Sequence, residues 1–162
     1  MPSFTQIRDK AVALLRATFP DLGRVEAFSG ELDLGTVSGK TLPAGVSVLV
    51  ATVGGNNSAV ENSLDFTMRG TFGVLIIANN VSSLEAGEAE ALAVAEKAAL
   101  ALHGATFGLP GVSPAKVFSI DAVHDEELTG RGLTVWSVVW RQRLVFTGGA
   151  LCQAFMKRWK SV

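Results

Sequence analysis

The chain has 162 residues, of which 48% are hydrophobic and 18% are charged, with a formal net charge of -1. This length fits one domain with a sizeable core. Soluble domains usually carry about 25% charged residues, so the low share of charged residues favours a surface partly covered by neighbouring chains. The charge gives no bulk positive field for nucleic acid, and the single cysteine, Cys152, excludes an internal disulfide framework and a multi-cysteine zinc site.

An amphipathic helix is predicted first. Ser3 is its expected N-cap, and Gln6, three residues further on, completes a capping box. Pro20 and Gly23 close the helix. One stripe at helical spacing is expected to face a core, formed by Phe4, Ile7, Ala11, Leu14, Leu15 and Thr18.

A short strand is predicted next, over residues 24–28, followed by a glycine-rich stretch at 29–40 that is typical of a loop. From Val46 to Val53 both faces of a strand are apolar, which indicates burial on both sides. The following stretch, 54–63, is polar and too long for a tight hairpin, so we expect a flexible loop there.

A long strand is predicted from Leu64 to Ala78. Its alternation places two sets on opposite faces: Leu64, Phe66, Met68, Phe72, Val74 and Ile76 on one, and Asp65, Thr67, Arg69 and Thr71 on the other. Beyond Gly73 the second face becomes apolar too, so the first half of the strand shows one side to water or a partner. Gly70 and Gly73 are expected to permit a bulge or bend.

A second helix is predicted from Ser82, which forms a capping box with Glu85, to about His103, with Gly104 as the left-handed C-terminal residue. Many of its residues are alanines, which let a helix lie close on a sheet. Its predicted seam consists of Leu92, Ala95, Ala99 and Leu102.

The remaining elements are a strand at 117–122, a polar turn at 124–131, a long strand at 134–146, and a short amphipathic helix at 150–160. This order predicts an α+β fold, in which two main helices pack on one face of a mostly antiparallel sheet. Residues 1–147 would form a single domain, and residues 148–162 a C-terminal extension.

No arrangement of residues argues for catalysis, a cofactor or a bound metal. His103 falls in the last turn of a helix, where a cation would meet the negative end of the dipole. His124 begins an acidic turn that superficially resembles a metal site, but consecutive carboxylates in a turn are usually solvated, and the calcium-loop pattern is absent. Lys157, Arg158 and Lys160 surround Trp159 in a basic tip that could touch nucleic acid or an acidic partner, although docking of this tail helix by its apolar face is favoured.

In order and spacing, the segments of residues 1 to about 147 resemble the tail terminator family of Mu-like bacteriophages and prophages. The resemblance rests on five segments: VEAFSGELD (25–33), LPAGVSVLVATVGG (42–55), FTMRGTFGVLIIANN (66–80) leading into the Ala/Glu-rich helix, LHGATFGLPGVSPAKV (102–117) and GLTVWSVVWRQRLVF (132–146). It implies a structural virion protein of the head-proximal end of the tail, assembled in the host cytoplasm. The protein would form a ring, expected to be a hexamer, that caps the tail tube and contacts a neck or head-completion protein.

Exposed loops at 54–63 and 123–130 would meet the tube or the neck, with the sheet flanking the inner wall of the ring and the helices outside. The candidate interface residues are Asn56, Asn57, Glu61, Asp125, Glu126, Phe155 and Trp159. We expect no signal peptide, no membrane contact and no sequence-specific nucleic acid, although DNA would pass through the ring. A cytoplasmic small-molecule-binding or accessory domain, or a hydrolase that uses His124, would be the alternatives.

Overall fold

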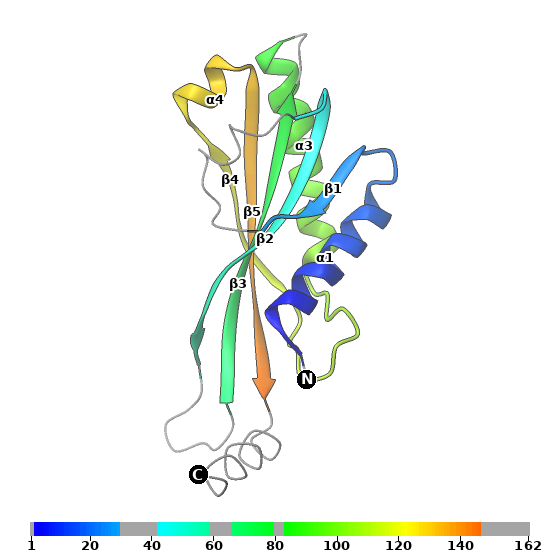
Figure 1. Ribbon diagram of the computed structural model, residues 1–162, viewed down its shortest axis with the longest axis vertical. Coiled ribbons are helices and arrows are strands. Elements are labelled where there is room, and N and C mark those ends of the chain that lie inside the picture. Colours follow the sequence, from blue (N-terminus) through cyan, green and yellow to red (C-terminus); the bar gives the residue numbers. More distant parts are fainter. Residues whose placement is uncertain (1, 30–41, 59–65, 80–82, 147–162) are drawn as a thin grey trace, which may run out of the picture.

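A computed structural model describes residues 2–29, 42–58, 66–79 and 83–146 (Figure 1). Its strands are β1 (Arg24–Ala27), β2 (Gly45–Asn57), β3 (Phe66–Asn79), β4 (Lys116–Val123) and β5 (Leu133–Phe146); its helices are α1 (Phe4–Thr18), α3 (Leu84–Leu102) and α4 (Glu126–Gly130). The strands form one sheet in the order β1-β2-β3-β5-β4, in which β1 and β2 are parallel and the other neighbours antiparallel. The predicted α+β class is therefore confirmed.

The predicted capping box at the start of α1 is present. Ser3 Oγ accepts from the backbone N–H of Gln6, and the Gln6 side chain accepts from the backbone N–H of Ser3, each at 3.1 Å. Two of the four backbone N–H groups that a helix start leaves unbonded are thus satisfied. The stripe faces the sheet, and its buried members include Ile7, Ala11 and Leu15.

Helix α3 begins one residue later than predicted. Its N-cap is Ser83 and not Ser82, because Ser83 Oγ accepts from the backbone N–H of Ala86 at 3.1 Å. The other end matches the prediction, since Gly104 has a φ of 85°, a left-handed conformation that favours glycine. Small residues cover the buried side of this helix, which lets it pack closely on β3 and β5: Gly87, Ala91, Ala95, Ala98 and Ala99.

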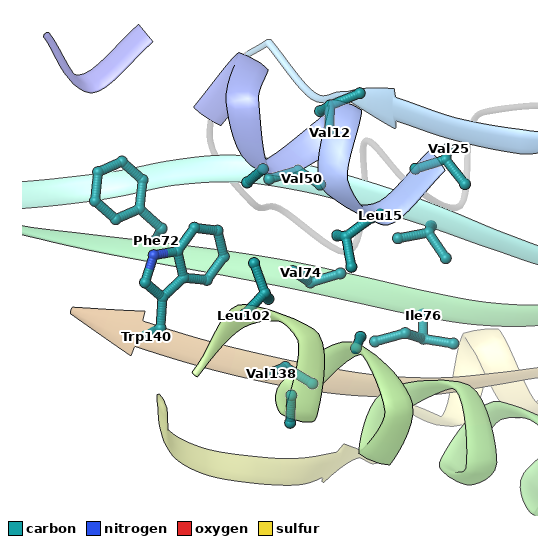
Figure 2. Packing of buried hydrophobic residues seen from close by; sticks show 14 of the residues in the cluster. Val12, Leu15, Val25, Val50, Phe72, Val74, Ile76, Leu102, Val138 and Trp140 are labelled. Atoms are coloured by element: carbon teal, nitrogen blue, oxygen red, sulfur yellow. The ribbon is translucent and has the colours of Figure 1, made fainter. Parts of the chain in front are cut away.

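The main core lies between the sheet and both long helices. The even-numbered residues from Phe72 to Ala78 of β3 and from Trp136 to Trp140 of β5 point into it, and the rings of Phe72 and Trp140 stack there with centroids 5.1 Å apart (Figure 2). Such a stack contributes about 0.5–1.5 kcal/mol beyond the burial of the two rings. The expectation of two helices on one face is thus confirmed.

The opposite face has a second, smaller core, confined to one half of the sheet. Leu128 of α4 is buried there against Leu49, Ala51, Leu75, Ile77 and Val135. The prediction of a polar turn at 124–131 is therefore wrong, because residues Glu126–Gly130 form the helix α4. Asp125 caps a short helix within it, and one apolar residue, Leu128, is enough to anchor this helix on the sheet.

Strand β2 is longer than predicted. Residues Gly54–Asn57, expected in a loop, continue the strand and pair with Met68–Thr71 of β3, because backbone pairing outweighs their low strand propensity. The bulge also lies elsewhere: it falls between Thr52 and Gly54 of β2, not at Gly70 or Gly73 of β3.

Gly70 has a packing role instead. It pairs across the strands with Gly55, and the Phe4 ring lies over both positions, so that a Cβ at Gly55 would come within 2.5 Å of this ring. Residues 30–40 of the predicted loop and the whole predicted helix at 150–160 lie outside the described residues.

Candidate assembly surfaces

The predicted interface residues fall at opposite ends of the sheet. Asn56 and Asn57 end β2, whereas Asp125 and Glu126 begin α4 (Figure 1). The register between Met68 and Asn79 of β3 puts eleven residue steps between these ends, which is roughly 37 Å of extended strand. Glu61, Phe155 and Trp159 lie outside the described residues.

At the α4 end, Asp125 has a structural role. Its carboxylate accepts from the backbone N–H groups of Glu127 and Leu128, at 2.9 and 3.1 Å. Glu127 in turn pairs with Arg131 at 2.9 Å, one helical turn away. Glu126 is exposed and caps nothing, so it is the better candidate for contact with a partner.

His103, the C-cap residue of α3, makes a structural contact. Its Nδ1 accepts a hydrogen bond from the backbone N–H of Val117 at 3.3 Å. This bond ties the end of α3 to β4. For His124, no group of three His, Cys, Asp or Glu side chains in the described part of the chain is placed to hold a metal ion.

A cluster of cations was not predicted from the sequence. Arg69 of β3, Lys116 of β4, and Arg141 and Arg143 of β5 are all exposed on the half of the sheet beyond the second core. Arg69 lies directly opposite Arg143, and Lys116 directly opposite Arg141. These four residues, here called the basic face, line one open hollow of about 460 Å³ together with Ser113, Pro114, Phe118 and Gln142.

Among the described residues, the arginines of the basic face differ from the other arginines in having no carboxylate or carbonyl partner. Elsewhere the arginines are engaged by described groups: Arg8 by Asp9 at 2.9 Å, Arg24 by Glu26 at 2.8 Å, Arg131 by Glu127 at 2.9 Å, and Arg16 by the Val25 carbonyl at 2.8 Å. Within residues 2–29, 42–58, 66–79 and 83–146, none of the four cations of the basic face forms an ion pair. Arg141 stacks over the half-exposed Phe118 ring at 4.2 Å.

The backbone beneath the basic face is held firmly. Gln142, which is 1% exposed, accepts from Trp140 Nε1 at 3.0 Å and donates to the carbonyls of Ala105 and Ser113 at 2.9 Å each. The backbone N–H of Arg143 donates to Ser113 Oγ at 2.8 Å. Long-range bonds thus fix the α3–β4 connection against β5, and the basic face lies on a rigid support.

Three stretches of sheet edge lack a strand neighbour among the described residues. The first is β2 beyond Val50, where the pairing with β1 ends; the others are the outer side of β4 and the outer side of β1. Val53, at the β2 bulge, is a large apolar side chain exposed to 57% on the first of these edges. Unpaired edges invite pairing with another chain.

These observations define a small α+β domain with open strands at both borders of its sheet and predicted contact residues at both sheet ends. No described helix is long and apolar enough to cross a bilayer. Its fold resembles that of a chain in a solved structure titled "Virion of native gene transfer agent (GTA) particle". The TM-score is 0.54 and the identity 18%, over 83% of this chain and 86% of that one. No family model and no curated protein matches the sequence. The likeness shows a shared fold.

Proposed function

We propose that this protein is a structural, non-enzymatic subunit of a phage-like virion, and that it is a tail terminator. In that role, copies close into a ring at the head-proximal end of the tail tube. The ring, which we propose to be a hexamer, stops polymerisation of the tube protein and presents its other side to a neck or head-completion protein. DNA passes through the ring without being read.

The observation that carries this proposal is the likeness to a chain of a virion particle, because it extends over most of both chains. It agrees with the family resemblance of the sequence, which rests on segments spread from β1 to β5. Since the identity is 18%, the virion role and the position in the tail come from the proposal and not from the fold alone.

The open edges support closure into a ring. A cyclic ring needs a heterologous contact, in which one patch meets a different patch on the next copy. The β2 edge near Val53 and the outer side of β4 lie on opposite borders of the sheet. An edge-to-edge contact between them would repeat from copy to copy and leave the helix layer on the outside.

The separation of the sheet ends supports a two-sided role. Asn56 and Asn57 at one end, and Glu126 at the other, cannot touch the same partner surface unless that partner spans the length of the sheet. We assign these ends to the tube and the neck, without ordering them. A small-molecule-binding domain is less well supported, because such sites are mostly apolar and enclosed, whereas the hollow on the basic face is open and lined by four cations.

The ring is tested by native mass spectrometry and sedimentation velocity of the full chain. We expect a closed oligomer of one size, alone or on addition of the tube protein. Val53→Glu places a charge on the β2 edge and is expected to reduce the ring fraction at least tenfold. The matched control is Leu100→Glu, on the outer side of α3 and 81% exposed, which should leave the ring intact. Loss of the ring in the control, or no loss in the Val53 variant, would refute this edge contact.

A further inference from the structure

The basic face has an electrostatic arrangement that folding does not require. Like charges directly opposite each other on neighbouring strands destabilise a sheet, yet Arg69 faces Arg143 in the register of β3 and β5. Uncharged polar residues would serve an exposed sheet face equally well. The described part of the chain supplies no carboxylate to these four cations, although it does so for Arg8, Arg24 and Arg131. Within the described residues these four cations are thus available to anions of another molecule.

We propose that the basic face binds the phosphodiester backbone of double-stranded DNA without reading its sequence. This inference rests on the proposed function, in which DNA passes the ring on the side of the sheet away from the helices. It assigns that contact to four named residues, Arg69, Lys116, Arg141 and Arg143.

The geometry matches a polyanion. Arg69 and Arg143 share one row of the sheet and Arg141 and Lys116 the next row, so the charges form a staggered line across three strands. Two strand spacings make this line about 10 Å wide. A guanidinium binds a phosphate through two parallel N–H donors, and the face is open enough for such approach because its hollow is a surface depression.

The same geometry argues against reading of bases. Base edges are read by a helix or a two-stranded ribbon that enters a groove, whereas these side chains project from the face of a three-strand surface. Backbone contacts alone position a protein on DNA and carry no sequence information. Because the chain has a net charge of -1, binding by a single copy is expected to be weak, and a ring would add the contribution of each copy.

An acidic protein surface is the other class of partner that could meet these cations. Protein interfaces are enriched in arginine and aromatic residues, but they are depleted in lysine, and their buried cores are mostly apolar. On the basic face, Lys116 is one of four exposed cations, and Phe118, exposed to 50%, is the large exposed apolar side chain that lines the hollow. Four cations around one such ring favour a polyanion over a protein surface.

The test is fluorescence anisotropy of a labelled duplex of about 30 base pairs, titrated with the full chain between 50 and 200 mM NaCl. Each phosphate contact contributes about 0.9 to the slope of log affinity against log salt concentration. The double variant Arg141→Gln/Arg143→Gln is expected to lower that slope by about 2 and the affinity at least tenfold at 100 mM NaCl. Lys116→Gln alone should lower the slope by about 1, and unrelated duplex sequences should bind equally.

The matched control is Lys10→Gln/Lys97→Gln, which removes two positive charges from exposed positions of the helix layer. Its salt slope should stay within 0.5 of that of the unmodified protein. An equal loss in this control would mean that net charge, and not the basic face, governs binding, and would overturn the inference. Unchanged DNA binding in the double variant would overturn it as well.

Sedimentation of the same variants separates this inference from the proposed function. If the basic face instead binds carboxylates of a neighbouring copy or of the tube protein, the double variant will lose that assembly and keep its DNA affinity. A ring that persists without DNA binding leaves the terminator role intact. If neither the unmodified chain nor any variant forms a ring, that result contradicts the proposed function and leaves the DNA-binding inference to be decided by the anisotropy measurement.

Discussion

Gln142 is the buried polar residue whose loss the structure predicts most sharply. Its side chain has one acceptor bond, from Trp140 Nε1, and two donor bonds, to the carbonyls of Ala105 and Ser113. These bonds join the middle of the sheet to the connection between α3 and β4. Gln142→Leu keeps a similar volume and removes all three bonds.

The expected cost follows from those three bonds. A buried hydrogen bond contributes about 0.5–1.5 kcal/mol net, and a buried donor left without a partner costs about 1–3 kcal/mol. The Trp140 indole N–H would be such a donor, whereas the Ala105 carbonyl keeps its bond from the Ala115 N–H at 2.8 Å. We therefore expect Gln142→Leu to lower the free energy of unfolding by about 2–4 kcal/mol.

Urea unfolding followed by circular dichroism measures this change. Trp140→Phe removes the indole donor, so Gln142→Leu should cost about 1 kcal/mol less in that background than in the unmodified protein. The exposed Arg141→Gln is the control and should stay within about 0.5 kcal/mol. If Gln142→Leu also stays within that range, or if the double-mutant cycle shows no coupling, the reasoning about this buried residue is wrong.

Two further predictions concern packing and capping. Gly70→Ala should destabilise the protein by about 1–3 kcal/mol in the same urea assay, because its Cβ would lie 2.8 Å from the buried Phe72 ring. The control is Gly54→Ala, whose Cβ would meet nothing within 4 Å and which should be neutral or slightly stabilising. Equal effects of the two substitutions would contradict the packing role of Gly70. Asp125→Ala should lower the free energy of unfolding by about 1 kcal/mol, because the α4 cap is lost. Glu126→Ala should leave stability unchanged and weaken binding of an isolated partner. The reverse pattern would show that the two roles are exchanged.

Local patterns were enough to predict most of the fold. The stripe from Phe4 and the cap at Ser3 predicted α1, and the alternation along β3 predicted its buried and exposed faces. The errors fall where tertiary pairing overrides local propensity. Gly54–Asn57 is poor in strand formers yet pairs with β3, and the turn at 124–131 holds a helix because Leu128 finds a second core.

The candidate surfaces were less accessible to sequence reasoning. Arg141 and Arg143 alternate along one predicted strand, which indicates a shared face. Arg69 and Lys116 lie next to them because of the strand order β3-β5-β4 and the register of these strands. Neither the order nor the register follows from the spacing of residues along the chain. Asp125 was predicted as a contact residue because capping carboxylates and solvated ones look alike in a sequence.

Cryo-electron microscopy of the assembled particle tests the central claim most directly. We expect density for this chain as a closed collar on the tail tube, with Val53 at the contact between copies and the basic face toward the DNA. Density for the chain anywhere else in the particle, or its absence from the particle altogether, would contradict the proposal that it terminates the tail.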